Sequence, residues 1–133
     1  MNSAAVDIKD MVVADSSLGY EFGTNIFVDT MPHDQENEAV SIWNSPAGRA
    51  PVGQPRDQYY RPAVTIQSRA YDPTIAHSNA FDLFQLLHGV HGEIWNGCRY
   101  ISILAVQEPR FVYRDESDRA VFSFDLRIDR TPV

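Results

Sequence analysis

The sequence has very little cysteine and lysine, and each shortage excludes a class of site. Cys98 is the only cysteine, so the chain cannot form an internal disulfide or a thiolate-rich metal site. Lys9 is the only lysine among 11 basic residues, no run of basic residues occurs, and the net charge is −7. Phosphate contacts need a positive field, so we expect no sequence-specific binding of nucleic acid.

Long hydrophobic runs are also missing. No stretch approaches the roughly 18 apolar residues of a membrane span, and Met1–Tyr20 has neither the basic start nor the apolar core of a signal peptide. The chain has 133 residues, of which 44% are hydrophobic, and this is enough material for one core. We therefore expect a single soluble domain, residues 1–133, without a membrane partner.

The common nucleophile and phosphate-binding motifs are absent as well. The sequence contains no G-x-S-x-G, no G-x-G-x-x-G and no Gly-rich phosphate loop. His88, His91 and Glu93 lie close together, but Gly89 and Gly92 interrupt the helix that a zinc site on one helical face would need. This cluster therefore indicates a polar turn.

Two further polar clusters are typical of exposed turns. His33 lies beside Asp34 and Glu36, and the run "DESD" at 115–118 holds three acids in four residues. Such a turn lacks the apolar pocket that raises a carboxylate pKa for catalysis. We expect no catalytic residue, no metal and no cofactor; a small enzyme is kept as the less favoured alternative.

Helical spacing of apolar residues occurs at two places. Ala5, Ile8, Met11 and Val12 predict an amphipathic N-terminal helix within residues 1–19. A second helix is predicted from the N-cap Asp72, with Pro73 at its first position, to Gly89. Its apolar stripe must lie on a sheet and consists of Ala76, Ala80, Phe81, Leu83, Phe84 and Leu87.

Short alternating runs predict β-strands in the first half of the chain. Residues 24–30 and 38–43 are expected to pair as a hairpin, with a polar turn between them. Residues 63–69 alternate as a half-buried strand does, which places Arg69 among the residues directed outward.

The second half predicts two more hairpins. Asn96-Gly97 is a strong signal for a type I′ turn, and residues 100–107 are apolar on both faces, which predicts a central strand. Residues 110–114 and 119–129 flank the charged turn and are expected to pair. The fold class predicted is α+β, with a mainly antiparallel sheet and helices packed on one face as an α/β sandwich.

Residues 44–60 stand out between the predicted strands and are expected to form a long flexible loop. Loops beyond about a dozen residues are most often functional or disordered. Three prolines remove amide donors and disfavour pairing as another strand: Pro46, Pro51 and Pro55. We expect this segment to expose Arg49 and Arg56 and to reach a partner outside its own domain.

Several segments carry a resemblance through their order and spacing. They are "GTNIFVDTMP", "EAVSIWNSPAG", "YYRPAVTIQSRA", the helix end "LFQLLHG" and "NGCRYISILAVQEPRFVYRDESDRAVFSFDLRIDR". Together they cover about Gly23–Arg130 and resemble the tail terminator or minor capsid protein family of long-tailed bacteriophages. None of them is a catalytic signature, and the N-terminal helix contributes nothing specific.

The resemblance implies a structural virion protein. Family members form a ring, usually a homohexamer, at the head-proximal end of a finished tail tube, after assembly in the host cytoplasm. The ring stops tube polymerisation and offers the surface for head–tail joining. The implied partners are copies of the chain, the major tail tube protein and a head–tail connector protein. We expect partner contacts from Arg49, Arg56, Tyr59 and Tyr60; a head-closure or tail-completion protein is the alternative.

Overall fold

The computed structural model of the chain describes residues 1–53 and 59–133. Helices and strands follow one another along the chain as α1 (Ala4–Ala14), β1 (Ile26–Val28), β2 (Ala39–Val52), β3 (Tyr59–Ala70), α2 (Pro73–Leu87), β4 (Glu93–Trp95), β5 (Cys98–Ala105), β6 (Arg110–Arg114) and β7 (Ala120–Pro132). The predicted N-terminal helix is therefore shorter than residues 1–19.

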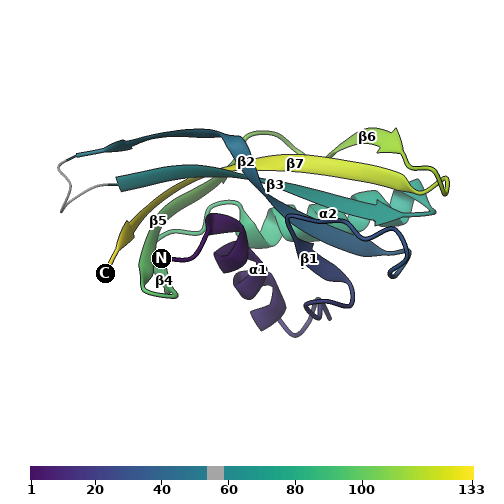
Figure 1. The fold of residues 1–133 in the computed structure, drawn as a ribbon, viewed down its shortest axis with the longest axis horizontal. Helices are drawn as coiled ribbons and strands as arrows, with labels where there is room; N and C mark the ends of the chain where they lie inside the picture. The colour runs from purple at the N-terminus through teal and green to yellow at the C-terminus, as the bar shows by residue number, and fades with distance from the viewer. Residues whose placement is uncertain (54–58) are drawn as a thin grey trace.

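The strands form one curled sheet. The order across it is β1-β2-β3-β7-β5-β4, and β6 pairs with β7 beyond the end of β5. All strand pairs are antiparallel except β1 with β2. Both helices lie on the same face of this sheet (Figure 1). The α+β prediction, with helices on one face of a mainly antiparallel sheet, is confirmed.

Local signals place both helix starts. The Ser3 side chain accepts a hydrogen bond from the amide of Val6, and Asp72 accepts one from Thr74, so each helix has a side-chain N-cap. Pro73 occupies the first turn of α2, where its missing amide costs nothing. The predicted cap and start of α2 are therefore confirmed.

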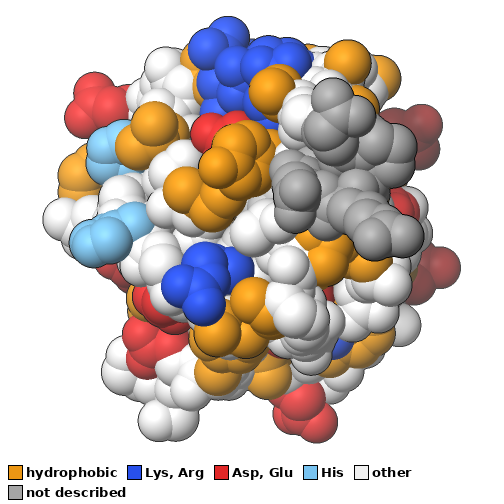
Figure 2. Space-filling model, turned by 90° about the vertical axis from the view of Figure 1, so that its left-hand side faces the viewer, with side chains coloured by type: hydrophobic (Ala, Val, Ile, Leu, Met, Phe, Trp, Pro, Cys, Tyr) orange, Lys and Arg blue, Asp and Glu red, His pale blue; other side chains and the backbone are white. Residues whose placement is uncertain are grey.

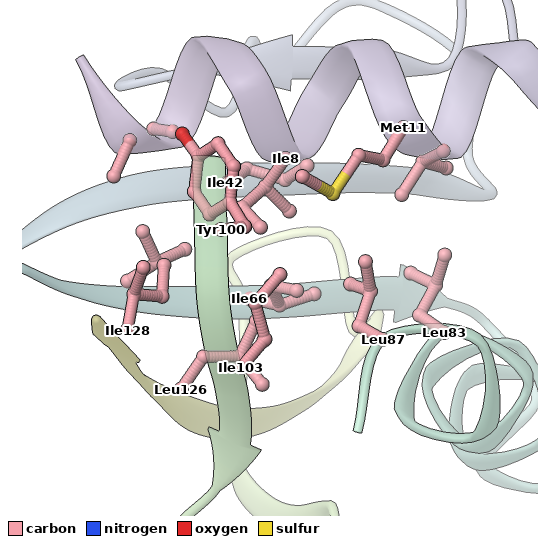
Figure 3. Packing of buried hydrophobic residues seen from close by; sticks show 14 of the residues in the cluster. Ile8, Met11, Ile42, Ile66, Leu83, Leu87, Tyr100, Ile103, Leu126 and Ile128 are labelled. Atoms are coloured by element: carbon pink, nitrogen blue, oxygen red, sulfur yellow. The ribbon is translucent and has the colours of Figure 1, made fainter. Parts of the chain in front are cut away.

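The core lies between the two helices and the sheet. Ile8 and Met11 of α1 and Leu83 and Leu87 of α2 point toward a layer of sheet side chains (Figure 3). That layer consists of Ile42, Ile66, Tyr100, Ile103, Leu126 and Ile128, all buried. Since apolar burial is the main favourable term in folding, this layer fixes how the helices sit on the sheet.

The hairpin predicted from residues 24–30 and 38–43 is wrong. β1 pairs with β2 in parallel, with Ile26 opposite Val40 and Val28 opposite Ile42. The connection, residues 29–38, therefore has to travel back along the sheet instead of turning tightly. It lies over the face opposite the helices, where Ser41 donates to the carbonyl oxygen of Thr30 and Arg69 to that of Pro32.

Arg69 lies on the outer face of the sheet, as the alternation predicts, but it is 2% exposed and does not reach solvent. Its side chain is buried beneath the β1–β2 connection and donates hydrogen bonds to the carbonyl oxygens of Pro32 at 2.9 Å, Glu36 at 2.7 Å and Asn37 at 3.5 Å. Burial first, and then the charge of the neighbouring Arg119, lower the pKa of Arg69. One guanidinium thus satisfies three carbonyls of an irregular segment, and no alternation pattern shows this.

The predicted loop over residues 44–60 is wrong for residues 44–52 and for Tyr59 and Tyr60. β2 continues to Val52 and pairs with β3, while residues 54–58, with Pro55 and Arg56, lie outside the described residues. Pro46 and Pro51 fit because they fall in the two places where the pairing shifts. Here β2 is an edge strand, and a proline without an amide is tolerated at bulges and edges.

The remaining strand predictions hold in part. Asn96 and Gly97 both have positive φ and join β4 to β5 as the predicted hairpin, and β6 pairs with β7 as expected. β5 lies between β7 and the short β4, but only one of its faces is buried. Its second face is open, with Leu104 50% exposed.

Candidate partner-binding surface

The sheet extends past its helices at one end. We call residues 44–52 of β2 and 59–63 of β3 the arm, which projects beyond α1 in Figure 1. A side chain at Gly48 would place its Cβ 3.3 Å from the backbone of Pro62 and of Ala63. A glycine at this position therefore lets the two arm strands approach each other closely.

One face of the arm end carries apolar and basic side chains together. We call this surface the arm patch; by pairing register and strand alternation it comprises Arg49, Val52, Tyr59, Arg61, Arg99, Ile101, Leu104, Arg127 and Asp129. It lies opposite the helix-covered face. Figure 2 shows this end of the molecule, with basic side chains between hydrophobic ones and most acidic side chains at the margin.

Two shallow hollows indent this face. The first, about 380 Å³, is lined by Arg49, Val52, Tyr59, Arg61, Ile101 and Asp129. The second, about 300 Å³, is lined by Ser45, Ala47, Ala63, Val106, Asp125, Leu126 and Arg127. A face with exposed apolar groups and hollows of this kind is typical of a protein-binding surface.

The arginines of the arm patch differ in how far they are paired. Arg49 lies 3.8 Å from Asp129, and Arg61 donates to the carbonyl oxygen of Ala50 at 2.9 Å. Within the described chain, no hydrogen bond or ion pair holds the guanidinium of Arg99 or Arg127, and both residues are exposed. Two guanidinium groups are therefore available to bind a partner.

The four residues predicted to contact partners do not lie on one surface of the structure. Arg49 and Tyr59 line the same hollow, and Tyr59 is 50% exposed. Tyr60 pairs with Arg130 and, as the next residue along the strand, points to the helix side. Arg56 lies outside the described residues. The prediction did not include Arg99, Leu104 or Arg127, although the second apolar face of residues 100–107 was a signal for Leu104.

The polar clusters noted in the sequence have structural partners. The guanidinium of Arg119 lies 3.2 Å from His33 Nδ1 and donates to Asp115 at 2.8 Å. Burial raises the pKa of Asp115, but hydrogen bonds from Arg119 and Ser117 outweigh it, and the pKa falls below its usual value. Among residues 1–53 and 59–133, no group of three or more histidine, cysteine or acidic side chains is placed to hold a metal.

A second buried cluster lies on the helix face and joins α1 to the sheet. Asp7 of α1 accepts hydrogen bonds from the Tyr100 hydroxyl and from the Arg130 guanidinium, the latter at 3.3 Å, and from Asn96 at 2.7 Å. Burial, together with the hydrogen bond to Asp7, raises the pKa of Tyr100. Asp7 is fully buried although it is acidic, and this cluster explains how its charge is satisfied.

Charge is distributed unevenly along the chain. Residues 1–38 contain eight acidic residues and one lysine, whereas residues 39–133 contain ten acidic residues and ten arginines. The whole net charge of −7 therefore comes from the first 38 residues. None of the described helices is long and apolar enough to cross a membrane.

Comparison with known proteins gives one family and one fold. A family model described as "Bacteriophage tail terminator protein" matches residues 6–132. A chain in the structure "Virion of native gene transfer agent (GTA) particle" is similar with a TM-score of 0.73 at 14% identity, over 96% of this chain and 94% of that one. No curated protein matches. At this identity the structural likeness shows the shared fold, and the family match covers nearly the whole chain.

Proposed function

Because the chain belongs to the bacteriophage tail terminator family, we propose that it caps the tail tube as a ring of identical copies, stops tube polymerisation and forms the head–tail joining surface. The family is one of structural tail proteins and not of enzymes. The ring would sit at the head-proximal end of the tail, after assembly in the host cytoplasm. Its partners there would be the major tail tube protein and a head–tail connector protein.

The arm patch is the observation that supports this function most directly. A ring requires two different surfaces on each copy, one for each neighbour, and a cap requires a further surface for the tube. The arm end provides a sheet face without a covering helix, with apolar side chains and unpaired arginines side by side. The family match and this open face point to the same use, which is contact with other proteins.

The function is tested by removing the protein from the assembling phage. Tails from cells infected with a phage that lacks this gene are expected to have uncontrolled lengths and no attached heads in electron micrographs. Adding the purified chain to that extract should restore a single tail length and head joining. Tails of normal length with heads attached, in the absence of this protein, would contradict the function.

The proposed partner contacts of Arg49, Arg56, Tyr59 and Tyr60 can be tested within the same assay. Tyr59→Ala should reduce the number of capped, head-joined tails, because its ring lies in the arm patch. Tyr71→Ala is a matched control, since Tyr71 is 54% exposed and follows β3 at the other end of that strand. Equal activity of the two variants would remove Tyr59 from the contact surface.

A further inference from the structure

Two groups of exposed charges with opposite sign lie near hollows of the described surface, and neither group is paired within the described residues. Arg99 and Arg127 in the arm patch are exposed and have no partner within the described residues. Glu36 and Glu38, just before β2, are exposed, and no hydrogen bond or ion pair holds their carboxylates in the described chain. Unpaired charges of opposite sign are free to form ion pairs between molecules.

The two glutamates lie at a concave surface. We call it the acidic hollow: about 390 Å³, lined by Thr24, Asn25, Glu36, Asn37 and Glu38. Its only charged side chains are negative, and the hollow is about as large as the larger arm-patch hollow. Phe22, two residues before Thr24, is 52% exposed, and the Lys9 ammonium lies 4.5 Å from the centre of its ring.

One molecule cannot join its own arm patch to its own acidic hollow. Glu38 comes directly before β2, and β2 runs 14 residues from Ala39 to Val52 at the arm. At about 3.3 Å per residue this strand separates Glu38 from Val52 by roughly 40 Å, and from Ser45, which is in register with Arg127, by roughly 20 Å. The β1–β2 connection lies at the end of the molecule away from the arm (Figure 1). The opposite charges can meet only between copies.

We propose that the arm patch of one copy docks on the acidic hollow of the next copy, with Arg99 and Arg127 facing Glu36 and Glu38. This inference rests on the proposed function and specifies how neighbours in the ring contact each other. A two-fold dimer that joined arm patch to arm patch would place arginines against arginines. Head-to-tail docking pairs opposite charges at every contact. A pair of copies still has one free surface of each kind, so further copies can add until the ring closes.

Charge reversal tests the pairing, since all four side chains are exposed. Arg99→Glu/Arg127→Glu, and separately Glu36→Arg/Glu38→Arg, should each reduce the number of capped, head-joined tails at least about tenfold when added to extracts lacking this protein. The chain that carries all four substitutions restores opposite charges at every contact. It should recover to within about twofold of the unaltered chain.

Controls separate this inference from the proposed function. Glu108→Arg changes an exposed acid on the β5–β6 connection, outside both surfaces, and should keep full activity. Circular dichroism of each purified variant checks that it folds. If the unaltered chain fails to cap tails, the proposed function fails.

Three results would overturn the pairing while the unaltered chain still caps tails. Reversal at the hollow could leave capping intact, which would mean that the arm patch meets another partner. Both reversed chains could fail without recovery in the four-substitution chain. Both reversed chains could also remain fully active. Recovery in the four-substitution chain, after loss in each reversed chain, is the result that supports the proposal.

Discussion

On the face of the sheet opposite the helices, two arginines at one end and two at the other differ in burial and in pairing. At the end covered by the β1–β2 connection, Arg69 and Arg119 are buried and bind backbone carbonyls of that connection. At the arm end, Arg99 and Arg127 are exposed and bind nothing within the described chain. Arg69 and Arg119 therefore stabilise irregular chain at one end, whereas Arg99 and Arg127 are free for another molecule at the other.

This contrast explains how a small domain can keep a stable fold and still offer a large contact surface. Removing one partner of a buried arginine destabilises the fold, because a buried charge is left unpaired. Removing the arginine itself leaves the carbonyl oxygens without their donor. An exposed arginine adds almost nothing to stability. Substitutions at the two ends should therefore affect different measurements, and the following predictions are ordered by their expected effect on stability.

The largest effect is expected at Asp7. Asp7→Ala leaves Arg130 buried without its carboxylate, and the free energy of unfolding should fall by about 3–5 kcal/mol. Asp10→Ala, on the same helix but partly exposed, should cost less than about 1 kcal/mol. Urea denaturation measures both. A similar loss in the two variants would show that the buried cluster does not anchor α1.

The next effect concerns the buried arginine at the covered end. Arg69→Met removes the donors to three carbonyls of the β1–β2 connection, and the free energy of unfolding should fall by about 2–3 kcal/mol. Amide hydrogen exchange should become faster in residues 29–38. Arg127→Met, the matched change at the arm end, should shift stability by less than about 0.5 kcal/mol. Equal losses would break the contrast between the two ends.

Alkaline pH should weaken the fold through the partly buried phenol of Tyr20. Burial first, and then the negative charges of Asp82 and Glu38, raise the pKa of Tyr20 to about 12. Since the folded state holds the phenol proton more tightly than the unfolded state, this contribution is complete below pH 10 and is lost as the pH rises toward 12. In urea titrations above pH 10, Tyr20→Phe should lose less stability with pH than the unaltered chain. Parallel slopes would contradict this assignment.

The smallest effect on folding belongs to the arm patch. Arg99→Ala/Arg127→Ala should leave the free energy of unfolding within about 0.5 kcal/mol of the unaltered chain. The same variant should reduce the yield of capped, head-joined tails severalfold, because the two guanidinium groups would lose their ion pairs with a neighbour. A fold that is destabilised, or capping that is unchanged, would assign these arginines to a different role.

The sequence predicted those parts of the fold that depend on near neighbours in the chain. The caps of α2, the Asn96-Gly97 turn and the pairing of β6 with β7 all follow from residues within a few positions of each other. The parallel pairing of β1 depends on contacts between residues 29–38 and Arg69, which lie more than 30 positions apart. No short pattern contains that information.

The surface was predicted in outline only. Proline content suggested an unpaired loop, yet Pro46 and Pro51 sit at irregular points of an edge strand, so the segment is mostly sheet. Arg49 and Tyr59 were included in the prediction because they lie within the segment. Arg99 and Arg127 lie far from it in sequence and join it only through the strand order, in which β7 separates β3 from β5.

The most direct test is a structure of the head-proximal end of the tail in the assembled particle, determined by electron cryomicroscopy. The account predicts a closed ring of this chain in which the arm patch of each copy is buried against the acidic hollow of the next. A ring in which Arg99 and Arg127 face solvent, or a tail end without this chain, would contradict it.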